Sequence, residues 1–166
     1  MSTPIVVDCE APFGVGAPSV GDMTEFGAVD VNALQHGRVE TFHGTDCSED
    51  TFRQFREWLA PRMPVVFVSD NPAYDFQWIN FYFWRYFGEN PFGHSGRRIA
   101  DFYAGLVGDF GSTQKWRRLR RTKHDHHPVH DALGFVPGRV LTLKKSGSSG
   151  WTRTSNPPVN SRMLCH

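Results

Sequence analysis

Cysteine is scarce in this sequence, and no two cysteines stand close together. Cys9, Cys47 and Cys165 are widely separated, and no C-x-x-C motif occurs among the 166 residues. An odd number of cysteines at this spacing predicts neither a disulfide framework nor a thiolate zinc site. We therefore expect a protein of a reducing compartment.

Long apolar runs and a basic, apolar N-terminus are also lacking. No stretch approaches the roughly 18 apolar residues of a membrane span, and the N-terminus has no signal-peptide pattern. We expect a cytoplasmic protein with no membrane partner. Hydrophobic residues reach 39%, aromatic residues 14% and charged residues 21%. This composition is typical of one folded domain and excludes a disordered or fibrous chain.

Charge is unevenly distributed along the chain, although the formal net charge is only +1. Residues 1–114 contain 15 acidic and 7 basic residues, whereas residues 115–123 contain six basic residues and no acidic one. An acidic body with one dense basic segment suits a protein that holds cations and also binds an anion. The near-neutral average therefore does not exclude a nucleic-acid substrate.

The residue patterns predict an α/β domain with a mixed sheet. β-branched or alternating runs indicate strands at 4–9, 23–31, 38–44 and 64–68, the middle two joined by a turn around 35–37. Capping residues and apolar spacing indicate one helix from Ser48, another from Asn71 through Phe87, and a first helical turn at 128–133. Residues 97–106 are either a strand or the start of a helix, and residues 115–123 a loop or short helix.

Two acidic residues, Asp8 and Glu10, stand at the end of the first buried strand. Side chains two residues apart in a strand lie on the same face, so their carboxylates repel each other and lose hydration. A hard cation such as Mg²⁺ or Mn²⁺ would neutralise them. The alternative is that the strand has ended and both acids are solvated.

Two further motifs carry candidate functional groups. Asp75 lies in the first turn of the helix that follows the central strand, either as an acid favoured by the helix dipole or as a third metal ligand. His126 precedes Asp131 by five residues within a tract of four histidines. This tract is a solvated turn, a histidine-rich metal site, or a general base beside a fourth carboxylate.

Taken together, the three motifs are recognisable. D-x-E at Asp8 and Glu10, N-x-x-x-D at Asn71 and Asp75, and H-x-x-x-x-D at His126 and Asp131 occur in order on suitable elements. They resemble the exonuclease motifs of DnaQ-like, DEDDh-type 3′–5′ exonucleases. The segments SDNPAYDFQWINFYF and LRRTKHDHHPVHDALG also look like a bacterial subfamily of small stand-alone members. The resemblance covers roughly residues 4–134.

The resemblance implies a ribonuclease H-like fold with a mixed five-stranded sheet flanked by helices. It also implies that four acids bind two divalent cations, Mg²⁺ or Mn²⁺, and that His126 is the general base. The expected reaction releases 5′-nucleoside monophosphates from the 3′ end of the substrate. The metal ligands would be Asp8, Glu10, Asp75 and Asp131. Single-stranded DNA or RNA with a free 3′ end is the expected substrate, and a homodimer is among the expectations. The expected substrate-binding residues are Phe13, Asn71, Lys115, Arg117, Arg118, Arg120, Arg121 and Lys123.

The C-terminal part departs from the family. Phe135, Pro137 and Gly138 interrupt the last helix, which we expect to be short and poorly anchored. Residues 135–166 contain no acidic residue and are rich in Gly, Ser, Pro and Asn. They predict a flexible tail after an exonuclease domain at residues 1–134, and we hypothesise that a frameshift or gene fusion has replaced the native C-terminus. An inactive nucleic-acid-binding module with a damaged last helix is the alternative function.

Overall fold

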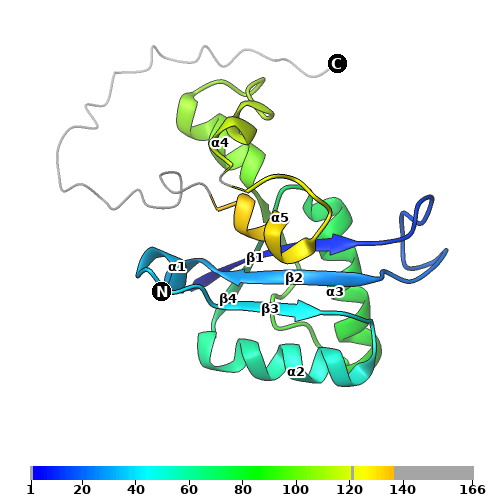
Figure 1. Cartoon of the computed structure of the whole chain (residues 1–166). Coiled ribbons are helices and arrows are strands. Elements are labelled where there is room, and N and C mark those ends of the chain that lie inside the picture. Colours follow the sequence, from blue (N-terminus) through cyan, green and yellow to red (C-terminus); the bar gives the residue numbers. More distant parts are fainter. Residues whose placement is uncertain (1, 121, 137–166) are drawn as a thin grey trace, which may run out of the picture.

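The computed structural model describes residues 2–120 and 122–136 of the chain, which form one mixed sheet with helices on both faces (Figure 1). The strands are β1 (Thr3–Glu10), β2 (Glu25–Asp30), β3 (Thr41–Gly44), β4 (Val65–Ser69) and β5 (Gly96–Arg98). The helices are α1 (Val31–Gln35), α2 (Glu49–Leu59), α3 (Pro72–Phe87), α4 (Ile99–Val107) and α5 (Pro128–Gly134), with short 3-10 turns at Ala60–Arg62 and Lys115–Leu119.

The sheet has five strands in the order β3-β2-β1-β4-β5. β2 is antiparallel to both β1 and β3, whereas β4 is parallel to both β1 and β5. The predicted α/β class with a mixed five-stranded sheet is confirmed. Because β1 and β4 are adjacent and parallel, their carboxyl ends lie at the same edge of the sheet, where ligand sites of α/β proteins form.

Strand β1 separates two hydrophobic cores by simple alternation of its side chains. Ile5, Val7 and Cys9 pack with α2 and α3 in the larger core, which is rich in aromatic rings. Val6 packs in the second core, together with Ala132 of α5. Asp8 and Glu10 continue the Val6 register, so the pleat directs both acids toward the face that α5 covers. In Figure 1, α5 lies over β1 and β2, and α2 lies along the opposite side of the sheet.

Several boundaries differ from the sequence prediction. The connection between β2 and β3 contains the short helix α1, because Asp30 caps it by accepting a hydrogen bond from the Ala33 amide at 2.9 Å. The ambiguous segment 97–106 contributes to both kinds of element, since it spans most of β5 and α4. The basic segment forms a 3-10 turn over Lys115–Leu119, within the predicted loop or short helix.

The last helix is short, as the sequence predicts, but the expectation of poor anchoring is wrong. α5 buries Pro128, Asp131 and Ala132 against β1 and β2. Phe135 and Val136, which the sequence analysis assigns to the tail, are also buried in the second core. The rest of the predicted tail, residues 137–166, lies outside the described residues, so its flexibility stays a prediction.

None of the helices in the described ranges is long and apolar enough to cross a membrane.

Gly27 in β2 allows α5 to approach the sheet. A Cβ atom at this position would lie 2.4 Å from both the Pro128 carbonyl carbon and the Val129 amide nitrogen. Because backbone atoms cannot rotate away, we expect Gly27→Ala to lower the free energy of unfolding by roughly 1–3 kcal/mol, measured by urea titration. Gly105→Ala in α4 is the matched control, since a Cβ there meets open space and alanine favours a helix. Equal stability of the Gly27→Ala variant and the wild type would contradict this packing.

Candidate active site

A cleft of about 380 Å³ opens at the edge of the sheet where β1 and β4 end. Residues from four parts of the chain line it: the end of β1, the start of α3, the basic segment, and the loop and residues flanking α5. They include Asp8, Glu10, Asn71, Tyr74, Asp75, Arg117, Arg120, His124 and Phe135. The fold therefore brings the first two sequence motifs to one cleft, and Asp131 of the third motif lies within 4.8 Å of Asp8 and Glu10.

Three acids from two elements converge at this cleft, which Asp8 and Glu10 line. Asp8 and Glu10 project from β1, and Asp131 projects from α5, which covers the same face. Each offers a carboxylate oxygen, and these oxygens lie within 4.8 Å of one another. Asp131 is fully buried, whereas Glu10 is about one-quarter exposed. The set can therefore present oxygen ligands to a cation that enters from solvent.

The electrostatics of the three acids favour a bound cation. Burial, reinforced by the nearby carboxylates of Asp75 and Glu10, raises the pKa of Asp8 to about 9. Burial also raises the pKa of Glu10, against the lowering effect of the nearby His126. Within the described residues, the Oδ2 atoms of Asp8 and Asp131 are buried and accept no hydrogen bond. Buried acceptors without donors, next to mutually repelling carboxylates, fit a hard divalent cation such as Mg²⁺ or Mn²⁺.

Asp75 reaches the cleft from the first turn of α3. Its Oδ1 accepts a hydrogen bond from the Cys9 amide at 3.1 Å, and its carboxyl is buried. Burial raises the pKa of Asp75 to about 7, although the hydrogen bond from the Cys9 amide opposes the rise. Asp75 thus links β1 to α3 and lines the cleft, but it stands outside the 4.8 Å group formed by the other three acids.

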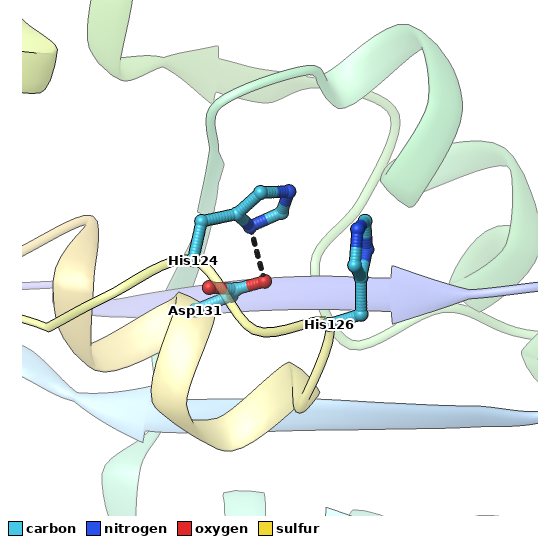
Figure 2. Close-up of side chains that lie close together, drawn as sticks. All are labelled: His124, His126 and Asp131. Atoms are coloured by element: carbon cyan, nitrogen blue, oxygen red, sulfur yellow. Dashed lines mark ion pairs between the residues drawn. The ribbon is translucent and has the colours of Figure 1, made fainter.

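The loop before α5 carries two histidines that flank the acids. His126 has a left-handed backbone with φ of 60°, and its Nδ1 lies 3.7 Å from Oε1 of Glu10. The Nδ1 atom of His124 lies 2.6 Å from Oδ2 of Asp131, without the geometry of a hydrogen bond. Figure 2 shows both rings beside the Asp131 carboxylate. The sequence motifs indicate His126 but not His124, which stands two residues earlier in the same histidine tract.

The basic segment divides into residues that face the cleft and residues that face solvent. Arg117 and Arg120 line the cleft, where Arg117 pairs with Asp70 at 3.1 Å and Arg120 donates to Oδ1 of Asp131 at 2.8 Å. Lys115 pairs with Asp109 at 3.4 Å. The remaining members are Arg118 and Lys123, which are exposed, and Arg121, which lies outside the described residues.

Arg120 is more deeply placed than a phosphate-binding role alone predicts. Its side chain is 13% exposed, and its guanidinium stacks over the Phe135 ring with 4.9 Å to the ring centre. It is therefore a resident counter-charge for the buried Asp131 in the metal-free protein. The sequence indicates the charge of Arg120 but not this pairing, which depends on the approach of α5 to the basic segment.

Two predicted substrate-binding residues have different surroundings. Asn71 lines the cleft, and its backbone carbonyl accepts hydrogen bonds from the Tyr74 and Asp75 amides that start α3. Phe13 is fully exposed in the loop after β1 and is not among the described residues that line the cleft. Tyr74 is an aromatic side chain that lines it.

Comparison with known proteins agrees with this geometry. The chain is 35% identical over 97 residues to the 3′-5′ DNA exonuclease Cap18 of Escherichia coli. The chain resembles DnaQ-like 3′–5′ exonucleases, as its three motifs predict. The match covers 50% of this chain and 49% of the relative, so the chain spans about half the length of that curated protein. No protein-family profile matches the chain.

The fold also has a counterpart among solved structures. The structure superposes on the zinc-bound crystal structure of E. coli ExoI in complex with single-stranded DNA, with a TM-score of 0.54 and 16% sequence identity. The superposition covers 85% of this chain and 39% of ExoI. The predicted ribonuclease H-like fold is confirmed by this similarity.

The raised pKa of Asp8 predicts how the metal-free protein responds to pH. Between the ordinary value of 3.8 and about 9, the folded state keeps a proton that the unfolded state releases, so the free energy of unfolding falls as pH rises. Asp8→Asn removes this titration. We expect the variant to be more stable than the wild type at pH 8, by roughly 1–3 kcal/mol, with a smaller difference at pH 5.

Urea unfolding in the presence of a chelator measures this difference at each pH. Asp50→Asn on the exposed face of α2 is the matched control, and it should leave the pH dependence of the wild type unchanged. A stability difference between Asp8→Asn and wild type that is the same at pH 5 and pH 8 would contradict the raised pKa.

Proposed function

We propose that this chain is a metal-dependent 3′–5′ exonuclease that releases 5′-nucleoside monophosphates from single-stranded DNA. The observation that carries the proposal is the convergence of carboxylate oxygens of Asp8, Glu10 and Asp131 to within 4.8 Å of one another, with His126 beside Glu10. The relative named as a 3′-5′ DNA exonuclease supports the reaction, and the ExoI complex with single-stranded DNA supports the substrate.

The four acids would hold two divalent cations, with Asp75 completing the set from α3. Bound cations would neutralise the charge that develops on the phosphoryl and leaving oxygens and would favour ionisation of the attacking water. The buried Oδ2 atom of Asp8 suits this role, because it accepts no hydrogen bond among the described residues, and Oδ2 of Asp131 has only the exposed His124 imidazole as its partner there. Mg²⁺ and Mn²⁺ are the ions that such oxygen ligands select.

His126 would act as the general base. Its side chain is 72% exposed, so an imidazole nitrogen can reach water in the cleft, and the Glu10 carboxylate lies 3.7 Å from Nδ1. A neighbouring carboxylate stabilises the imidazolium that forms when the ring accepts a proton. The loop would thus hold an imidazole base beside the acids without burying it.

The cations of the basic segment would hold the substrate backbone. Arg117 lines the cleft, and Arg118, the next residue in the chain, is exposed, so both are available to phosphate oxygens. Tyr74, at the cleft wall, and Phe13, in the loop after β1, offer rings on which terminal bases can stack. The proposal also includes RNA as a second substrate and assembly of the chain into a homodimer. Each needs its own experiment.

The inactive binding module is the less favoured alternative. It depends on damage to the last helix, yet α5 is packed on the sheet and delivers a fully buried Asp131 to the other acids. The proposed domain of residues 1–134 therefore contains a complete set of the acids that the three motifs predict.

A nuclease assay tests the proposal. A 5′-labelled single-stranded DNA incubated with Mg²⁺ or Mn²⁺ should shorten from its 3′ end, giving a ladder that keeps the label. Asp8→Ala should abolish the ladder because it removes a central ligand, and His126→Ala should slow it roughly 10²–10⁴-fold because the base is lost. Asp50→Ala, exposed on α2, is the control and should retain the wild-type rate.

Three results would count against the exonuclease. Release of the label as a mononucleotide would show the opposite polarity, and equal activity of Asp8→Ala would place the chemistry elsewhere. Retained DNA binding by the wild type with no metal-dependent shortening would favour the inactive module. A matched RNA oligonucleotide in parallel reactions measures the preference between the two substrates.

A further inference from the structure

The side chains of His124, His126 and Asp131, here called the imidazole cluster, bring three metal-binding groups together. Their ligand atoms lie within 4.8 Å of one another, and the two imidazole rings are 4.3 Å apart between centres. Figure 2 shows both rings standing on one side of the loop that precedes α5, next to the Asp131 carboxylate. The left-handed backbone at His126 turns the loop at this point.

The carboxylates of Asp8, Glu10 and Asp131 are here called the acid group. The imidazole cluster suits different metals from the acid group. Imidazole nitrogen is a ligand for Zn²⁺, Ni²⁺, Co²⁺ and Cu²⁺, whereas Mg²⁺ prefers oxygen and keeps much of its water. Two imidazoles and one carboxylate make a three-residue zinc set that leaves a fourth position open. A transition-metal ion would therefore choose His124 and His126 over the oxygen ligands of Asp8 and Glu10.

Asp131 supplies the observation that points to a cation in the cluster. The side chain is fully buried, yet its Oδ2 accepts no hydrogen bond within the described residues. His124 Nδ1 forms an ion pair with this oxygen at 2.6 Å, although the contact lacks hydrogen-bond geometry. An ion bound to both atoms, with metal–ligand bonds of about 2 Å, would replace this pair after a small outward shift of the His124 ring. Because the His124 and His126 side chains are 52% and 72% exposed, their rings are free to rotate onto an ion from solvent.

We propose that the imidazole cluster binds a zinc-type transition-metal ion and that this binding inhibits nuclease activity. The inhibitory part rests on the function proposed above. A metal-bound imidazole has no free lone pair on the bound nitrogen, so His126 could not accept a proton there. Asp131 belongs to both the imidazole cluster and the acid group, so an ion on the cluster also draws one acid away from the Mg²⁺ or Mn²⁺ site.

Cobalt absorption spectroscopy tests the metal site independently of activity. The untagged full chain is titrated with Co²⁺ in excess Mg²⁺, which fills the oxygen ligands. Four-coordinate Co²⁺ with imidazole ligands absorbs visible light far more strongly than six-coordinate Co²⁺ with oxygen ligands. We expect a strong band that saturates at one Co²⁺ per chain and is removed by added Zn²⁺. The affinity for Co²⁺, measured from this band, should fall at least tenfold in His124→Ala and His124→Gln.

His130→Ala is the matched control, because His130 lies in the same tract but is exposed and pairs with Asp125 at 3.1 Å. Its Co²⁺ band and affinity should equal those of the wild type. Far-ultraviolet circular dichroism of each variant verifies that the fold is retained. An unchanged band in both His124 variants, or an equal loss in His130→Ala, would overturn the assignment to the imidazole cluster.

Inhibition is measured on the labelled DNA at saturating Mg²⁺ with increasing Zn²⁺, each variant being compared with its own zinc-free rate. The zinc concentration for half inhibition should rise at least tenfold in His124→Ala and stay unchanged in His130→Ala. Equal zinc sensitivity of His124→Ala and wild type would overturn the inhibitory role. A His124-dependent Co²⁺ band on a chain without nuclease activity would support the metal site and refute the proposed function together with its inhibition.

Discussion

One constraint governs the site: the fold brings several carboxylates together although they repel one another. β1 continues its alternating pattern past Val6, so Asp8 and Glu10 must occupy the face that α5 covers, where Asp131 already lies. Burial and the neighbouring acids raise the pKa of Asp8 to about 9 in the metal-free protein. Such an arrangement costs folding free energy unless a cation is present, and Arg120 supplies only one such charge. The strand register thus creates a group of acids that could hold a metal ion.

Function and packing are joined through α5. α5 has only seven residues. Because Gly27 has no Cβ atom, the α5 backbone can approach β2, and Ala132 and Phe135 pack in the second core. The loop before it must then pass beside the acids, which places His124 and His126 at the cleft rim. A short helix that packs tightly on the sheet can therefore fix the position of the Asp131 carboxylate, although the isolated helix would have little stability.

The sequence predicts the sheet and the motif residues because both depend on local patterns. The apolar runs of β1 and β4 and the Asn71–Pro72 helix start specify where the parallel strands end, and this edge gathers Asp8, Glu10 and Asp75. By contrast, the Arg120–Asp131 pair and the His124 contact depend on how α5 meets the basic segment, which no local pattern encodes. The burial of Phe135 and Val136 was missed for a similar reason: the nearby proline and glycine end the helix without ending the packing.

Equilibrium urea unfolding of the full chain at pH 8 in increasing Mn²⁺ tests the central claim that the acid group is a cation site. An ion that binds only the folded state adds about 1.4 kcal/mol to the free energy of unfolding for each tenfold rise in concentration above its dissociation constant. If two ions bind, we expect the free energy of unfolding to rise by about 2.8 kcal/mol per tenfold increase in Mn²⁺, and we expect Asp8→Asn to lose this dependence. A free energy of unfolding that does not change with Mn²⁺ would contradict it.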